Sequence, residues 1–169
     1  MKRIWSICLC SLLYALPARA QLPATPFELA PQQPLPKAAV VSGYLRTLAQ
    51  ASPLARMTQL GVSAGGRSID ALLISEDLPF LASTERSKDK PTVMLLGSQH
   101  GNEPSGSEVL QILSRRLLDG DLRPLVSRMN FVVVALANPD GRDLNRRLNA
   151  KDENPNLDFI AVSSPETRI

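Results

Sequence analysis

The segment from Gln99 to Glu103 contains the only histidine of the chain, His100, followed three residues later by the carboxylate of Glu103. On a turn between a strand and a helix, this spacing lets an imidazole nitrogen and a carboxylate oxygen converge on one divalent ion. Zn²⁺ takes nitrogen and oxygen ligands at about 2.0–2.2 Å and keeps one position open for water in catalytic sites. The alternative is a surface histidine beside a glutamate that favours a helix N-terminus. The spacing alone leaves both interpretations open.

The elements around this segment predict an α/β fold. The apolar runs 92–96 and 131–136 are typical of strands buried on both faces. Between them, residues 104–118 carry an apolar stripe and are flanked by Pro104 and Gly120, as expected of a helix. A strand–helix–strand order implies a right-handed parallel crossover. Ligands of such sheets bind beyond the carboxyl ends of the strands, where 97–103 and 138–141 would lie.

Upstream segments add a helix and a hairpin. Apolar side chains recur at helical spacing over roughly 37–50, and the runs 58–62 and 68–75 flank a Gly-Gly turn. Residues 76–91 are polar and predict a loop. We expect a mixed, largely parallel sheet flanked by helices. The predicted buried stripes are Val40, Val41, Tyr44, Leu45 and Leu48 in the first helix and Val109, Leu110, Leu113 and Leu117 in the second.

Four motifs occur in an order that resembles the zinc carboxypeptidases of the M14 family, over roughly residues 37–165. They are a G-x-S-x-x-G-R stretch at 61–67, the His-x-x-Glu of 100–103, an N-P-D-G turn at 138–141 and Asn149-Ala150. The resemblance implies a mixed α/β sheet with zinc at the strand ends and hydrolysis of peptide bonds by a zinc-activated water. By matching position, His100 and Glu103 would be zinc ligands, Arg147 would stabilise the oxyanion, and Asn156 would bind the substrate's terminal carboxylate.

The sequence departs from the family pattern at three places. Leu157 replaces the Arg expected after Asn156, and leucine makes no bidentate carboxylate contact. Asn154 replaces the acidic residue that orients a metal-bound imidazole, although a neutral amide still accepts an imidazole N–H. The chain ends at Ile169 and offers no second His and no candidate for the late Glu that the family uses as general base. We expect the chain to be the front half of the domain, with a weak two-ligand zinc site.

The leading hypothesis is therefore a secreted, zinc-dependent metallocarboxypeptidase-like hydrolase of peptide or amide bonds, truncated and inactive as this chain alone. One alternative is a non-catalytic periplasmic fragment or binding module with a weak metal site. Another is a related zinc amidase or deacylase, because Leu157 weakens the demand for a free C-terminal carboxylate.

The first twenty residues have the pattern of a secretory signal peptide. Lys2 and Arg3 precede an apolar run of about 13 residues, shorter than the roughly 20 that span a bilayer, and small residues precede Gln21. We expect a signal peptide, 1–20, cleaved after Ala20, and a secreted or periplasmic product without stable membrane insertion. Residues 21–36, with five prolines, predict an extended linker before the domain at 37–169. Both cysteines lie inside 1–20, so the mature chain has no thiol.

Charge argues against one class of partner. Residues 21–169 hold 16 basic and 16 acidic side chains. A net charge of zero removes the electrostatic attraction that nucleic-acid binding requires, so we expect no nucleic-acid partner. The family resemblance implies a peptide or amide substrate instead.

Overall fold

The structure is a computed structural model that describes residues 21–31, 34–83 and 90–169. The predicted signal peptide, residues 1–20, lies outside this range. No helix in the described ranges is long and apolar enough to cross a membrane.

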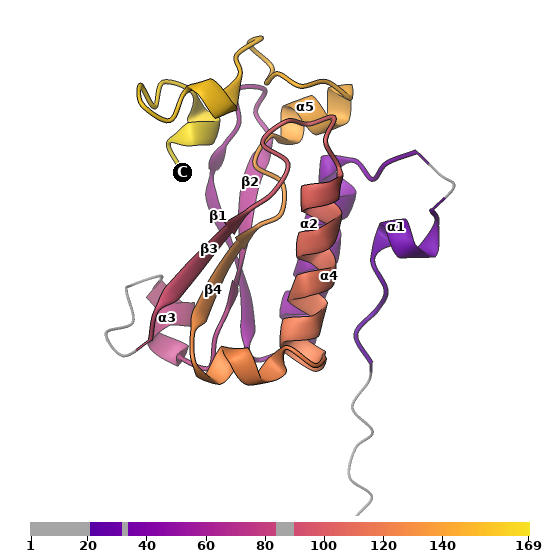
Figure 1. The fold of residues 1–169 in the computed structure, drawn as a ribbon, viewed down its shortest axis with the longest axis vertical. Coiled ribbons are helices and arrows are strands. Elements are labelled where there is room, and N and C mark those ends of the chain that lie inside the picture. The colour runs from indigo at the N-terminus through magenta and orange to yellow at the C-terminus, as the bar shows by residue number, and fades with distance from the viewer. Residues whose placement is uncertain (1–20, 32–33, 84–89) are drawn as a thin grey trace, which may run out of the picture.

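A four-stranded mixed sheet forms the centre of the fold (Figure 1). Its strands are β1 (Ala55–Val62), β2 (Ser68–Ile74), β3 (Thr92–Leu96) and β4 (Asn130–Val134), in the order β1-β2-β4-β3. β3 and β4 are parallel, which confirms the predicted parallel pairing, whereas β1–β2 and β2–β4 are antiparallel. The mixed α/β sheet flanked by helices is confirmed, although parallel pairing is limited to one pair among these strands.

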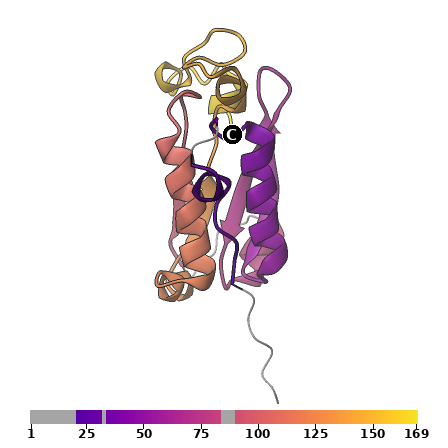
Figure 2. The ribbon, with the colours of Figure 1, turned by 90° about the vertical axis from the view of Figure 1, so that its right-hand side faces the viewer.

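Two helices cover one face of the sheet. α2 (Ala38–Ala51) and α4 (Ser105–Asp119) lie side by side on it (Figures 1 and 2). They bury most of the predicted apolar stripes against strand residues such as Leu72 and Val133. The stripes were wrong at two positions, since Val40 and Val109 are exposed. Each of these residues lies at the edge of its apolar stripe and is turned away from the sheet, because successive helix positions differ in direction by about 100°.

The opposite face of the sheet is only partly covered. A short helix, α3 (Leu78–Ser83), lies in the segment predicted to be a loop, and its Phe80 packs on Leu73. The prediction that β3 is buried on both faces was wrong. Met94 is 53% exposed and Leu96 is 37% exposed, because alternate side chains of a strand lie on opposite faces and these two lie on the face that the long helices do not cover. β4 is flanked by two strands and is buried over nearly its whole length, as predicted.

The proline-rich segment before the domain is docked rather than uniformly extended. It contains one helical turn, α1 (Pro26–Leu29), closed by a capping box between Thr25 and Glu28. In Figure 2, α1 lies between α2 and α4, on the side that faces the viewer. Arg115 of α4 holds Glu28 through two contacts of 2.8 Å, and Tyr44 of α2 donates to the Pro23 carbonyl at 3.0 Å.

Candidate metal centre

The loop after β3 brings His100 and Glu103 together. This loop leaves the carboxyl end of the strand and leads into α4, and the Glu103 N–H donates to the His100 carbonyl at 3.1 Å. His100 Nδ1 lies 3.0 Å from Glu103 Oε2. The imidazole is buried, whereas the Glu103 side chain is exposed. The two predicted ligands therefore lie side by side at the expected edge of the sheet.

Asn154 orients the imidazole from the other side. His100 Nε2 lies 3.1 Å from Asn154 Oδ1, and the same oxygen accepts the Asn156 backbone N–H at 3.1 Å. That backbone donor requires an acceptor, so the atom facing His100 is the amide oxygen and not the amide nitrogen. Nε2 must then carry the proton in this contact, which leaves the lone pair of a neutral ring on Nδ1.

The donor set fits a zinc ion at Nδ1. In the neutral ring, the Nδ1 lone pair faces a carboxylate oxygen, an acceptor opposite an acceptor. A cation between them turns this repulsion into two ligand bonds; the alternative is an imidazolium that donates from both nitrogens. Two ligands of one tetrahedral zinc lie about 3.3 Å apart, close to the observed 3.0 Å. In the described part of the chain, no cluster of three or more His, Cys, Asp or Glu side chains occurs, so this set comprises two ligands.

Arg147 lies at the same site. Its Nη1 donates to Glu103 Oε1 at 2.9 Å, so the two carboxylate oxygens face different partners. When the ring donates from both nitrogens, its hydrogen bond to Glu103 is the largest influence on the pKa of that carboxyl and lowers it, and Arg147 acts in the same direction. About half of the Arg147 side chain remains exposed, so its guanidinium can reach a ligand in solvent.

Asn156 is placed less directly. It lies in the single-turn helix η2 (Pro155–Leu157), is exposed, and is tied to the site through its backbone N–H to Asn154. Leu157 follows with a side chain that is 79% exposed. The structure thus brings His100, Glu103 and Arg147 into one site and leaves Asn156 at its border.

The remaining motifs hold this site together. The buried Asp140, in α5 (Pro139–Leu144), accepts the Gly65 N–H at 2.8 Å and Arg67 Nη1 at 2.7 Å. Asn138 caps α5 by accepting the Gly141 N–H at 2.8 Å, and its Nδ2 donates to the Arg147 carbonyl at 3.2 Å. The G-x-S-x-x-G-R and N-P-D-G motifs are therefore interlocking turns that position Arg147. The two motifs drew attention to Gly65, Arg67, Asn138 and Asp140 in the sequence, but the spacing of these residues did not predict that they contact one another.

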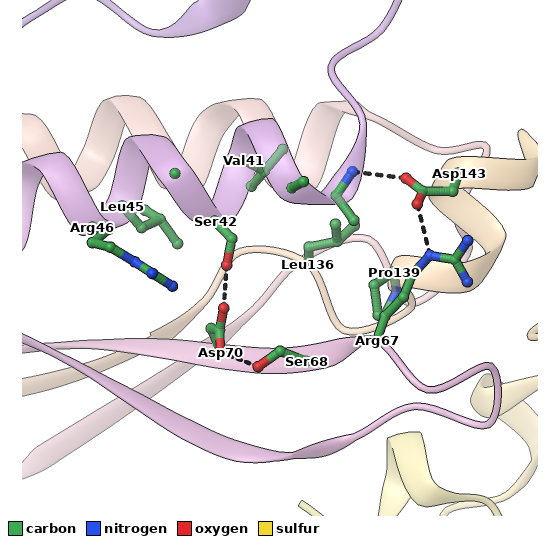
Figure 3. Close-up of a pocket in the computed structure, with 13 residues that line it drawn as sticks. Val41, Ser42, Leu45, Arg46, Arg67, Ser68, Asp70, Leu136, Pro139 and Asp143 are labelled. Carbon is green, nitrogen blue, oxygen red and sulfur yellow. Dashed lines mark hydrogen bonds and ion pairs between the residues drawn. The ribbon is translucent and has the colours of Figure 1, made fainter.

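A separate cavity of about 500 Å³ lies between α2, the start of β2 and α5 (Figure 3). The predicted site residues do not line it. Its carboxylates are already paired: Asp70 accepts from Ser42 and Ser68, and Asp143 accepts from Arg67 Nε at 2.7 Å and from the Ala38 N–H at 2.8 Å. These contacts join α2, the hairpin and α5, so this cavity is a structural junction.

Comparisons with known proteins agree with this geometry. The sequence model of the zinc carboxypeptidase family matches residues 41–159. The chain is similar to carboxypeptidase D of Rattus norvegicus (32% identity over 76% of this chain and 10% of that protein) and to carboxypeptidase 2 of Trichophyton rubrum (28% identity, 76% and 24%). A metallo-carboxypeptidase structure from Burkholderia cenocepacia superposes with a TM-score of 0.66 at 26% identity, over 79% of this chain and 36% of that one. The chain therefore spans well under half of the length of these relatives.

Proposed function

The chain belongs to the zinc carboxypeptidase family, and we propose that it forms the part of a zinc-dependent peptidase that carries two metal ligands and the oxyanion-binding arginine. The substrates would be peptides or related amides. The third ligand and the general base that the family resemblance implies have no counterpart in this sequence, which contains a single histidine. We propose that the chain by itself binds zinc weakly and does not turn over substrate.

One observation carries this proposal. His100 Nδ1 and Glu103 Oε2 lie 3.0 Å apart, while Asn154 holds the opposite ring nitrogen at 3.1 Å. A histidine without a binding role on the protein surface is usually exposed, whereas the His100 ring is buried and contacted at both nitrogens. Orientation of a ligand imidazole by an outer hydrogen-bond acceptor is the usual arrangement in protein metal sites.

The residues divide the work as follows. Bound zinc would supply Lewis-acid polarisation of the scissile carbonyl and a lowered pKa for water. His100 and Glu103 would hold the ion, and Asn154 would keep the proton of His100 on Nε2. Arg147 would place its guanidinium where negative charge develops on the carbonyl oxygen, the arrangement that contributes most in acyl transfer. Asn156 would contact the end of the substrate.

The single histidine makes the test direct. In the chain labelled with ¹⁵N-histidine, the ring signals come from His100 alone, so a zinc titration reports one site. We expect saturable shifts dominated by Nδ1, loss of binding in His100→Ala, and weakened binding in Glu103→Gln. Glu76→Gln is the matched control, since Glu76 also pairs with an arginine, at 2.8 Å, but lies elsewhere. Zinc binding that survives His100→Ala would contradict the proposal.

An amidase or deacylase substrate is the second candidate, and exposed Leu157 favours it. A hydrogen bond to a charged group contributes about 1.5–3 kcal/mol, so loss of the usual arginine should reduce the preference for a free carboxylate by roughly tenfold to a hundredfold. The test requires a version of the enzyme that includes the third ligand and the base. Equal kcat/KM for matched free-acid and amidated peptides, with discrimination restored by Leu157→Arg, would support this substrate class.

For localisation, we propose export with cleavage after Ala20. Intact-mass measurement of the secreted product tests this, and a mature N-terminus other than Gln21 would contradict it.

A further inference from the structure

Residues 98–103 form the metal-ligand loop, so named because it carries the two proposed ligands. Behind it lie two buried side chains of opposite charge with unpaired polar atoms. Glu108, in the first turn of α4, is 8% exposed, and Arg142, in α5, is 2% exposed. Both carboxylate oxygens of Glu108 lack a hydrogen-bond partner, as do Nε and Nη1 of Arg142. Buried, unpaired ionisable groups are costly, so their retention here requires an explanation.

Each of these groups supplies the charge that the other needs. Burial raises the pKa of Glu108, and the nearby positive charge of Arg142, followed by the side chain of Gln111, opposes that rise. Burial lowers the pKa of Arg142, and the charge of Glu108 is the main influence that opposes it. The unpaired atoms are also complementary, since two acceptors on Glu108 match two donors on Arg142. Ordered water commonly bridges such groups inside proteins.

Arg142 contacts the metal-ligand loop directly. Its Nη2 donates to Ser98 Oγ at 3.0 Å, and Ser98 Oγ donates to the Glu103 carbonyl at 2.9 Å. Ser98 has a positive φ of 46°, an uncommon conformation for a residue with a side chain. Its carbonyl also accepts the Asn138 N–H at 3.1 Å. The loop that carries both ligands is thus held from behind in a strained conformation.

We propose that Glu108 and Arg142 form a buried, water-bridged ion pair that positions the 98–103 loop, and through it His100 and Glu103, for metal binding. The ion pair acts through Ser98, so both members are positioning residues that do not contact the metal. The metal-binding role of the loop rests on the proposed function above. The pairing of Glu108 with Arg142 and its effect on the loop conformation are independent of that function.

The test uses the full chain and compares Glu108→Gln, Arg142→Met and the double variant. Zinc affinity is measured from the His100 ring signals. We expect each single variant to weaken zinc binding tenfold to a hundredfold, the range typical of outer partners of metal ligands. Because the two residues act as a unit, the double variant should be no weaker than the worse single variant. Ser98→Ala should weaken binding in the same direction.

Glu76→Gln is the matched control. It breaks a glutamate–arginine pair away from the site, the contact with Arg123 at 2.8 Å, and should leave zinc affinity unchanged. A merely structural role would lower the melting temperature of the Glu108 and Arg142 variants without changing zinc affinity relative to this control. Unchanged affinity, or single effects that add in the double variant, would overturn the proposal.

A zinc-free measurement separates this inference from the proposed function. If the wild-type chain binds no zinc at His100, the proposed function fails, yet the ¹⁵N shifts of the ring still report its tautomer. Glu108→Gln should then reduce the share of the Nε2-protonated form, as loop order is lost. A ring tautomer identical to that of the wild type would overturn the positioning role. Glu108→Gln preserves side-chain shape, and circular dichroism verifies that it folds.

Discussion

The amide oxygen of Asn154 lies 3.1 Å from His100 Nε2, although 54 residues separate the two in the chain. The contact exists because η2 folds back over the loop after β3, with the Asn156 N–H holding the same oxygen. It determines which ring nitrogen is free to bind a cation. Where the family resemblance leads us to expect a carboxylate, the chain uses a neutral acceptor that keeps the orientation but adds no charge.

Asn154→Asp should therefore tighten zinc binding. A carboxylate at this position makes the imidazole a more basic ligand, and we expect up to about a tenfold gain in affinity, whereas Asn154→Leu should lose tenfold to a hundredfold. Calorimetric titration measures both. Asn102→Asp is the control, because it adds the same charge at an exposed position in the metal-ligand loop without contacting His100 through its side chain. An equal gain in this control would mean that charge alone is responsible.

Arg147→Met should strengthen zinc binding while removing the proposed oxyanion contact. Arg147 competes with the ion for the Glu103 carboxylate at 2.9 Å, and its positive charge repels the cation. An exposed pair contributes about 0.2–1 kcal/mol, so the gain should be at most about fivefold and should shrink in high salt. Arg123→Met breaks a comparable pair with Glu76 and should have no effect on zinc. Weaker binding in Arg147→Met would indicate that Arg147 supports the ligands.

Gly101→Ala should severely destabilise the fold. A Cβ at this position would lie 1.8 Å from the Gly141 carbonyl carbon and 2.1 Å from the Arg142 nitrogen, both backbone atoms. We expect a loss of about 3 kcal/mol or more in the free energy of unfolding, measured with urea. Gly43→Ala, inside α2 with no atom near the added methyl group, should instead gain about 0.5–1 kcal/mol. Equal effects of the two substitutions would refute the close packing of the two turns.

Asp158 should make the protein sensitive to acid. Hydrogen bonds from Ser163 and Thr167, and from the Ser164 N–H, hold the pKa of Asp158 far below its ordinary value of 3.8. A carboxyl whose pKa is lowered in the folded state stabilises that state fully above its unfolded pKa, and this contribution is lost as the pH falls below 3.8 toward the folded pKa. Unfolding free energies from pH 7 to pH 2 should decline less steeply in Asp158→Asn. Asp152→Asn controls for the change in net charge, and an unchanged acid slope in Asp158→Asn would count against this role.

The edge strand β3 should promote self-association. Met94 presents an exposed apolar side chain on a strand that has one partner in the described sheet. We expect concentration-dependent association in sedimentation velocity, reduced by Met94→Lys. Val109→Lys places the same charge on an equally exposed apolar position of α4 and should have little effect. A monomer at all concentrations would contradict the expectation.

Local sequence by itself determined the main strands and helices and the proximity of the two proposed ligands. The 92–96 strand, the Gly-Gly hairpin and the two long helices follow from short-range periodicity and turn residues, and a His-x-x-Glu spacing at the start of a helix places His100 and Glu103 together wherever the loop lies. The likeness of the four motifs to one family added Arg147, and the structure places it on Glu103. These predictions depend on residues that are close in sequence or on the order of motifs.

Tertiary structure decided what depends on packing between distant segments. Whether Val40, Val109 and the side chains of β3 are buried depends on which other elements cover them. The pattern of apolar residues in the sequence does not specify those elements. The docking of α1, the clamp of Asp140 on Gly65 and Arg67, and the approach of Arg142 to Ser98 join segments far apart in the chain. Contacts of this kind arise from the assembled geometry, because polar groups that the fold buries must find partners among whichever side chains the packing brings near.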